Sequence, residues 1–177
     1  MAAWTLRLLD TPADMKAAED LQLIVWPGSP IDVVPDHLLI TLAHNGSPVI
    51  GAFEQNDDNQ EVRLIGVAFG FPGMDDASAE RQYKFCSHQV GVPPDFEGAG
   101  IGFALKRAQW QMARQQGYAR ITWTYDPLLS RNAYLNIAKL GTVCNTYKRE
   151  VYGEMRDGLN VGFPSDRFQV DWWLNTP

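Results

Sequence analysis

Apolar residues recur along this chain with two different periods, and the places where the period changes predict the secondary structure. Alternation with a period of two is typical of strands, and apolar residues three and four apart are typical of helices. Alternating or β-rich stretches predict strands over residues 4–8, 48–54, 61–71, 83–92, 121–125, 145–152 and 167–174. Helical spacing predicts helices over residues 12–25, 35–45, 100–117 and 131–140, and residues 72–80 are expected to form an exposed connection.

Two of the predicted helices carry start or stop signals. Thr11-Pro12 supplies an N-cap followed by proline at the first helical position, and Asn45-Gly46 ends the second helix. The residues expected to face inward are Ala17, Ala18, Leu21, Ile24 and Val25 in the first helix and Leu38, Leu39 and Leu42 in the second. The third helix has the most regular apolar stripe, which consists of Ile101, Ala104, Leu105, Ala108 and Met112.

The predicted elements follow the order β-α-α-β-β-β-α-β-α-β-β. A doubly wound fold would alternate strand and helix throughout, so this order predicts an α/β protein of the mixed α+β sandwich type. The 177 residues match the size of one ordinary domain, and we expect residues 1–177 to fold as a single domain.

Composition and charge narrow the classes of function. Apolar residues make up 45% of the chain and charged residues 20%, which is typical of a globular protein. The net charge of −6 argues against non-specific binding to nucleic acid or an anionic membrane. No apolar run approaches the roughly 20 residues of a membrane helix, and the amino terminus lacks a signal-peptide pattern, so a cytoplasmic location is expected. Two distant cysteines and three histidines match no metal-ligand spacing, so no metal is expected.

A glycine-dense turn precedes the third helix and carries the strongest chemical signal. Gly98, Gly100 and Gly102 lie where the helix begins. Glycine lets a backbone approach a ligand closely, and the first helical amides lack intrahelical partners. With the helix dipole, such amides can hold a pyrophosphate without a lysine. The alternative is a tight turn with no ligand. The spacing matches neither G-x-G-x-x-G nor a Walker loop.

The segment Glu97-Gly98-Ala99-Gly100-Ile101-Gly102 is similar to the Gln/Arg-x-x-Gly-x-Gly/Ala motif of the GNAT (Gcn5-related N-acetyltransferase) family. Val90-Gly91-Val92 resembles the strand that pairs with pantetheine in that family, and residues 121–132 and 166–174 resemble a subgroup of predicted acetyltransferases. The resemblance implies a mostly antiparallel twisted sheet flanked by helices, with the fourth and fifth strands splayed apart. It also implies acetyl-CoA or another acyl-CoA as co-substrate.

The resemblance assigns the residues that bind this co-substrate. Backbone amides from Gly98 through Phe103 are expected to hold the CoA pyrophosphate, and Val90, Val92 and Asn132 the pantetheine arm. The full set of expected binding residues is Val90, Gly91, Val92, Glu97, Gly98, Ala99, Gly100, Ile101, Gly102, Phe103 and Asn132. Glu97 departs from the family pattern, because an acidic side chain beside a pyrophosphate should weaken binding unless it points away.

Acyl transfer to an amine needs a base for the nitrogen and an acid for the departing thiolate. His88 is the candidate base, because histidine titrates in the useful range. Simple alternation places it on the same face as Val90; a hydrogen-bonded histidine with no catalytic role is the alternative. The position where the family has an acidic tyrosine is occupied by Ile137. Tyr134 is the nearest replacement, with Tyr147 and Tyr152 more remote.

Other residues have two interpretations each. Trp26, Trp123, Trp172 and Trp173 could line an acceptor pocket or pack in the core. Arg131 and Arg167 could bind an acceptor carboxylate or form surface ion pairs. Cys86 and Cys144 are expected to be buried, inert thiols.

The sequence therefore predicts an N-acyltransferase that moves an acetyl group directly from acetyl-CoA to the primary amine of a small molecule. A non-catalytic acyl-CoA-binding module and a structural, partner-binding domain remain as alternatives. A homodimer is also expected to be possible, because the aromatic-rich strand over residues 167–174 is predicted to be an exposed edge.

Overall fold

The computed structural model describes residues 3–28, 30–75, 82–153, 162 and 164–175. Its strands are β1 (Trp4–Leu8), β2 (Val49–Gln55), β3 (Glu61–Asp75), β4 (Gln82–Gly91), β5 (Arg120–Tyr125), β6 (Val143–Lys148) and β7 (Arg167–Trp173). Its helices are α1 (Pro12–Val25), α2 (Asp36–His44), α3 (Ile101–Gln115) and α4 (Ser130–Ala133). Single turns form η1 (Pro30–Asp32) and η2 (Pro94–Phe96), and α4 continues into a π-helical segment, η3 (Tyr134–Lys139).

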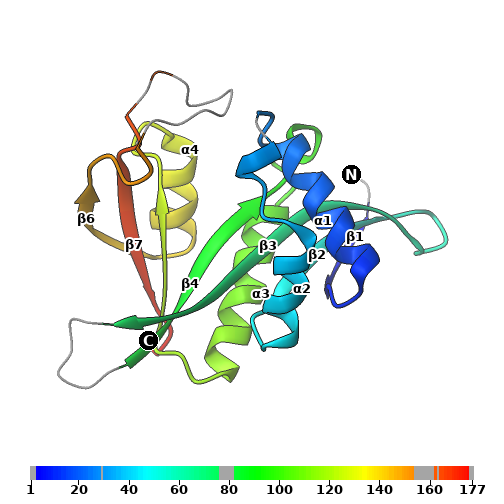
Figure 1. Cartoon of the computed structure of the whole chain (residues 1–177), viewed down its shortest axis with the longest axis horizontal. Helices are drawn as coiled ribbons and strands as arrows, with labels where there is room; N and C mark the ends of the chain where they lie inside the picture. The colour runs from blue at the N-terminus through cyan, green and yellow to red at the C-terminus, as the bar shows by residue number, and fades with distance from the viewer. Residues whose placement is uncertain (1–2, 29, 76–81, 154–161, 163, 176–177) are drawn as a thin grey trace.

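The predicted elements are all present, and their bounds differ by a few residues. The exposed connection expected over residues 72–80 is wrong for its first part, because Pro72 to Asp75 continue β3 and pair with Phe85 to Gln82 of β4. Residues 76–80 lie outside the described residues. The long β3–β4 pair thus extends well past the rest of the sheet, as Figure 1 shows.

The seven strands form one sheet in the order β1-β2-β3-β4-β5-β7-β6. Every neighbouring pair is antiparallel except β4 and β5, which run parallel. This arrangement confirms the mixed α+β class. It also corrects one expectation: β7 is not an edge strand, because it lies between β5 and β6, and β6 forms the edge.

The parallel pair β4–β5 is continuous over only a short length. Phe85 pairs with Ile121 and Cys86 with Thr122, and the two strands then separate. Figure 1 shows β4 and the strand leading to α4 diverging toward one end of the molecule. The predicted splaying of the fourth and fifth strands is confirmed. Backbone groups of β4 that face β5 beyond this point have no strand to pair with.

Helices cover both faces of the sheet. Helices α1 and α2 pack on one face over a cluster that includes Met15, Leu39 and Phe69, and α3 packs on the other face through Ile101 and Leu105. A third cluster joins α3 to the carboxyl-terminal strands, and its members are Phe85, Ala113, Ile121, Trp123, Tyr125, Leu140, Val170, Trp172 and Leu174. None of the described helices is long and apolar enough to cross a membrane.

The start of α1 forms as predicted, but parts of the inward faces do not. Thr11 accepts a hydrogen bond from the Asp14 amide in a capping box, with Pro12 at the first turn. Ile24 is 59% exposed and Leu38 is 44% exposed, so the expectation that they face the core is wrong. Gln22 is buried instead, where its side chain bonds both backbone groups of Val34.

Candidate active site

The glycine turn connects the end of β4 to the first turn of α3. Gly98 and Gly100 have φ angles of +82° and +83°, a conformation that side chains rarely adopt. No atom lies within 4 Å of the position that a Cβ would occupy at either residue, so the space above the turn is open. The helical ladder begins with the Ala104 amide bonded to the Gly100 carbonyl, which leaves the preceding amides without acceptors in the helix. An anion would fit this turn without moving the backbone.

The acidic residue of the turn has a basic partner. The Glu97 carboxylate accepts a hydrogen bond from the Arg131 guanidinium of α4, and both side chains are largely exposed. The pair connects the glycine turn to α4, the helix that also contains Asn132. Arg131 offsets the negative charge of Glu97. The repulsion between this carboxylate and an anionic ligand is therefore weaker than the sequence alone suggests. The expectation that Arg131 binds an acceptor carboxylate has no support, since its described partner is Glu97.

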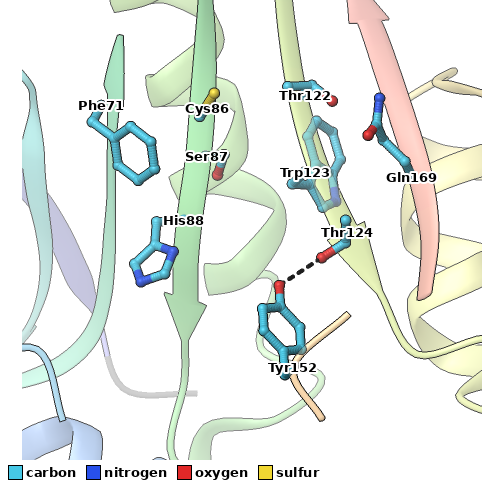
Figure 2. Close-up of a pocket in the computed structure, with 9 residues that line it drawn as sticks. All are labelled: Phe71, Cys86, Ser87, His88, Thr122, Trp123, Thr124, Tyr152 and Gln169. Atoms are coloured by element: carbon cyan, nitrogen blue, oxygen red, sulfur yellow. Dashed lines mark hydrogen bonds between the residues drawn. The ribbon is translucent and has the colours of Figure 1, made fainter. Parts of the chain in front are cut away.

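A pocket of about 170 Å³ lies over the point where β4 and β5 separate. Figure 2 shows side chains from β3, β4, β5, β7 and the segment after β6 around it. The lining residues are Phe71, Cys86, Ser87, His88, Thr122, Trp123, Thr124, Tyr152 and Gln169. The polar groups of these described residues are hydroxyls, an imidazole, an indole, an amide and a thiol. Such a volume accommodates the reacting ends of two ligands and not a whole large ligand.

The β4 strand contains a bulge beside this pocket. Phe69 of β3 pairs with Gln89 and the next residue, Gly70, pairs with Ser87, so His88 is an extra residue in β4. The His88 ring lies 5.8 Å from the ring of Phe69, on the face covered by α1, whereas Val90 packs against the cluster under α3. The expectation that His88 and Val90 share a face is therefore wrong, because a bulge reverses the alternation that follows it.

His88 is placed where a ligand in the pocket could reach it. Its ring is flanked by Phe69 and Phe71, each with a centroid distance of 5.8 Å. The His88 residue is exposed to solvent on one side. The protein around the rest of the ring displaces water, and this desolvation lowers the pKa of His88 below its ordinary value. The imidazole is thus neutral near pH 7 and able to accept a proton.

No family model matches the sequence, and no curated protein matches it. Solved structures do match along nearly the whole chain. An acetyltransferase of the GNAT family from Streptococcus pneumoniae is 12% identical, with a TM-score of 0.70 over 98% of this chain and 100% of that chain. Arabidopsis thaliana NAA60 in complex with acetyl-CoA is 12% identical, with a TM-score of 0.74 over 97% of this chain and 99% of that chain.

A third match is the ribosomal-protein-S18-alanine N-acetyltransferase from Escherichia coli, which is 15% identical. Its TM-score is 0.69, over 99% of this chain and 96% of that chain. The chain has the GNAT fold. Its separated β4 and β5, and the glycine turn between β4 and α3, are the features that the resemblance of the sequence to this family implied.

The two tyrosines considered as proton donors lie in different places relative to the pocket. Tyr134 is 61% exposed at the start of η3 and does not line the pocket. Ile137, at the position of the usual tyrosine, is 42% exposed on the same π-helical segment. Tyr152 does line the pocket, and its hydroxyl lies 3.1 Å from the Thr124 hydroxyl of β5, as Figure 2 shows. Tyr152, which the sequence analysis treated as more remote than Tyr134, is therefore the one of the two that lines the pocket.

Two polar residues of α3 lie beneath the pocket and have no counterpart in the sequence predictions. Lys106 is 5% exposed and Gln109 is fully buried, and both contact the hydroxyl of Ser87. Both positions lie beside the apolar stripe of α3, and the packing of the helix on the sheet buries them.

The remaining candidates have structural explanations. Trp123 both packs in the core and lines the pocket, whereas Trp172 is buried against it. Trp26 lies 2.9 Å from the position of a Cβ at Gly91, so only glycine fits there. Burial raises the pKa of the Cys86 thiol, which fits the expectation of an inert group.

Proposed function

We propose that this protein is an acyl-CoA-dependent N-acyltransferase that transfers an acetyl group to a primary amine. The observation that carries the proposal is the joint position of the open glycine turn and the pocket at the separation of β4 and β5. One end of the gap between the strands offers free amides for an anion, and the other offers a neutral imidazole. The fold shared with acetyltransferases supports the same assignment.

The donor side uses backbone groups. Within the expected range from Gly98 to Phe103, the Ala99 amide already donates to the Phe96 carbonyl. The other amides of this range would hold the CoA pyrophosphate, because the turn is open and a helix amino terminus favours negative charge. Val90, Val92 and Asn132 would hold the pantetheine arm along the separated edge of β4. When bound, acyl-CoA supplies an activated thioester carbonyl. Arg131 keeps the Glu97 carboxylate paired, which reduces its repulsion of the phosphates.

The acceptor side uses the pocket. His88 would remove a proton from the ammonium form of the acceptor, since its lowered pKa keeps it neutral at physiological pH. The Tyr152 hydroxyl, already aligned on Thr124, would hold the amine by a hydrogen bond. Tyr134 takes no part in this arrangement.

The acceptor is proposed to be a small-molecule amine. The pocket admits only the amine end of any acceptor, so a peptide amino terminus is the second candidate. The Escherichia coli neighbour is a ribosomal-protein-S18-alanine N-acetyltransferase, which favours testing peptides beside small amines.

Calorimetric titration with acetyl-CoA, succinyl-CoA and free CoA tests the donor site, and thiol release with small amines and short peptides tests turnover. Binding with turnover supports the proposal and identifies the acceptor class. Binding without turnover across both acceptor sets would instead favour an acyl-CoA-binding module. No binding of any CoA ester would leave the glycine turn as a turn only and would refute the proposal.

A further inference from the structure

A lysine is buried beneath the gap between β4 and β5. Lys106 lies in the second turn of α3 and is 5% exposed. Its Nζ is 2.8 Å from the Ser87 Oγ of β4 and 3.5 Å from the ring centroid of Trp123 of β5. Lysine is rarely buried unless it is paired with an acid, so this position requires an explanation.

No acid accompanies it. Across the described part of the chain, no carboxylate lies within ion-pair distance of the Lys106 Nζ. The groups against it are the Ser87 hydroxyl from β4, the Trp123 ring from β5 and, through Ser87, the Gln109 amide of α3. None of these groups carries a charge. Desolvation lowers the pKa of Lys106 well below its usual value near 10.5, which favours the neutral amine.

Ser87 connects this lysine to the pocket. The Ser87 side chain lines the pocket beside His88, and its Oγ contacts Lys106 and the Gln109 Oε1, each at 2.8 Å. The serine therefore lies between the buried amine and the space where ligands would react. Figure 2 shows it at the separation of the two strands, next to Trp123.

The hydrogen bonds of Ser87 can be reversed. The Gln109 Nε2 is buried and has no hydrogen-bond partner among the described residues. If the Gln109 amide exchanges its two ends, the Nε2 donates to the Ser87 Oγ, and the serine hydroxyl becomes free to donate to the Lys106 Nζ. Ser87 can then either give a proton to Lys106 or receive one from it, without leaving its own oxygen unpaired.

The proposed reaction has a second proton to carry, and among the described hydroxyls that line the pocket Ser87 is the one that contacts a buried amine. An acceptor ammonium loses two protons when it becomes an amide nitrogen. His88 can release the first to solvent before attack. The second leaves the nitrogen after attack, and the departing thiolate needs one. The usual tyrosine is replaced by Ile137, and Tyr134 lies away from the pocket.

We propose that Ser87 and Lys106 form a proton relay that carries this second proton from the attacking nitrogen to the departing thiolate. As the N–H bond breaks, the proton passes to the Ser87 Oγ while the serine proton passes to the Lys106 Nζ. As the C–S bond breaks, the Lys106 ammonium returns a proton to Ser87, and the serine hydroxyl protonates the thiolate. The relay ends in its starting state. This inference rests on the proposed N-acyltransferase function.

The test replaces each relay residue and one neighbour. Lys106→Met keeps the length of the side chain without an amine, Ser87→Ala removes the hydroxyl, and Arg107→Met alters an exposed cation at the next position of α3. Thiol release gives kcat and the KM for acetyl-CoA, and thermal unfolding gives Tm. We expect Lys106→Met and Ser87→Ala each to lower kcat by about a hundredfold or more, in the range of general acid–base catalysis, with KM within about twofold. Arg107→Met should leave kcat unchanged.

Stability separates a relay from a packing role. Removing an unpaired buried amine should keep or raise the Tm of Lys106→Met while its kcat falls. The double variant should be no slower than the slower single variant, because both act on one step. Wild-type kcat in Lys106→Met, or losses that multiply in the double variant, would overturn the relay alone. Wild-type protein that neither binds acetyl-CoA nor releases thiol would overturn the proposed function and the relay together.

Discussion

The substitution Gly102→Glu should weaken acyl-CoA binding without unfolding the protein. Gly102 lies in the first turn of α3, and the nearest atom to its hypothetical Cβ, the Val92 Cγ2, is 4.0 Å away. A side chain therefore fits, and Gly102, unlike Gly100, has no positive φ to be strained. A carboxylate in the first helical turn also interacts favourably with the helix dipole, by about 0.3–1 kcal/mol. The Tm of Gly102→Glu should match or exceed that of the wild type.

The same carboxylate should repel a pyrophosphate held at the turn. Two phosphate charges about 6 Å from the introduced carboxylate give about 1.4 kcal/mol of repulsion at the dielectric constant of water. At an effective dielectric constant of about 20 the repulsion is roughly four times as large. The lower figure alone corresponds to about a tenfold weaker Kd. Gln111→Glu is the matched control, because it adds the same charge at an exposed site of the same helix. It lies nine residues along α3, about 14 Å away, which exceeds the Debye length in physiological salt.

Calorimetric titration with acetyl-CoA and with free CoA measures both variants against the wild type. Gly102→Glu should lose at least about tenfold in affinity for both ligands, and Gln111→Glu should lose none. Equal affinities in all three proteins would refute the assignment of the turn as the pyrophosphate site. Equal losses in both variants would show a general effect of net charge instead.

Three further predictions concern the pocket and the first helix. Since neutral His88 is the proposed base and burial lowers its pKa, wild-type kcat/KM should fall only at a pH below the range where an ordinary histidine titrates, and His88→Gln should flatten that limb in a pH–rate profile. Tyr152→Phe should raise the KM for the acceptor by roughly two- to tenfold, which corresponds to the loss of one hydrogen bond. Tyr134→Phe should leave kcat and KM unchanged, and the reverse pattern would support Tyr134 as the proton donor. Arg7 lowers the pKa of Asp14 to about 2, so this carboxylate contributes about 2 kcal/mol that is present above pH 4 and lost as pH falls toward 2. Asp14→Asn should remove that contribution in urea unfolding at pH 7, and an unchanged midpoint would contradict it.

Local chemistry explains which predictions from the sequence succeeded. The start of α1 depends on Thr11 and Pro12, which act within one turn, and the structure forms there as expected. The glycine turn is likewise a local signal, since Gly98 and Gly100 take conformations that only glycine adopts readily. The splaying of β4 and β5 came from the family resemblance, and no pattern within either strand indicates it.

The predictions that were wrong share a cause. Each concerned a feature that depends on contacts between residues far apart in the sequence. His88 and Val90 were expected on one face, but a bulge against β3 separates them, and strand alternation carries no sign of it. The position of β7 inside the sheet depends on where β6 pairs, which the order of elements along the chain does not determine. Gln22 is buried because Val34 needs its hydrogen bonds, and an apolar pattern places such a residue outside.

Lys106 and Ser87 were missed for a related reason. Charged residues are normally assigned to solvent, and periodicity alone gives no ground for an exception. Only the packing of α3 under the gap between β4 and β5 shows that position 106 lies inside. The interpretation of Tyr152 failed similarly, because the segment after β6 returns to β5 through a contact with Thr124.

Helix α3 has a mechanical position that follows from the short β4–β5 pairing. The sheet consists of two halves, β1 to β4 and β5 with β6 and β7, joined at only two paired positions. The first turns of α3 pack on the former half through Ile101 and Leu105, and Ala113 packs with the latter. Helix α3 therefore crosses the boundary between the two halves and packs on both. If the gap between β4 and β5 widens or narrows, α3 must bend or slide. Movement of the two half-sheets relative to each other therefore involves the packing of α3 on both of them.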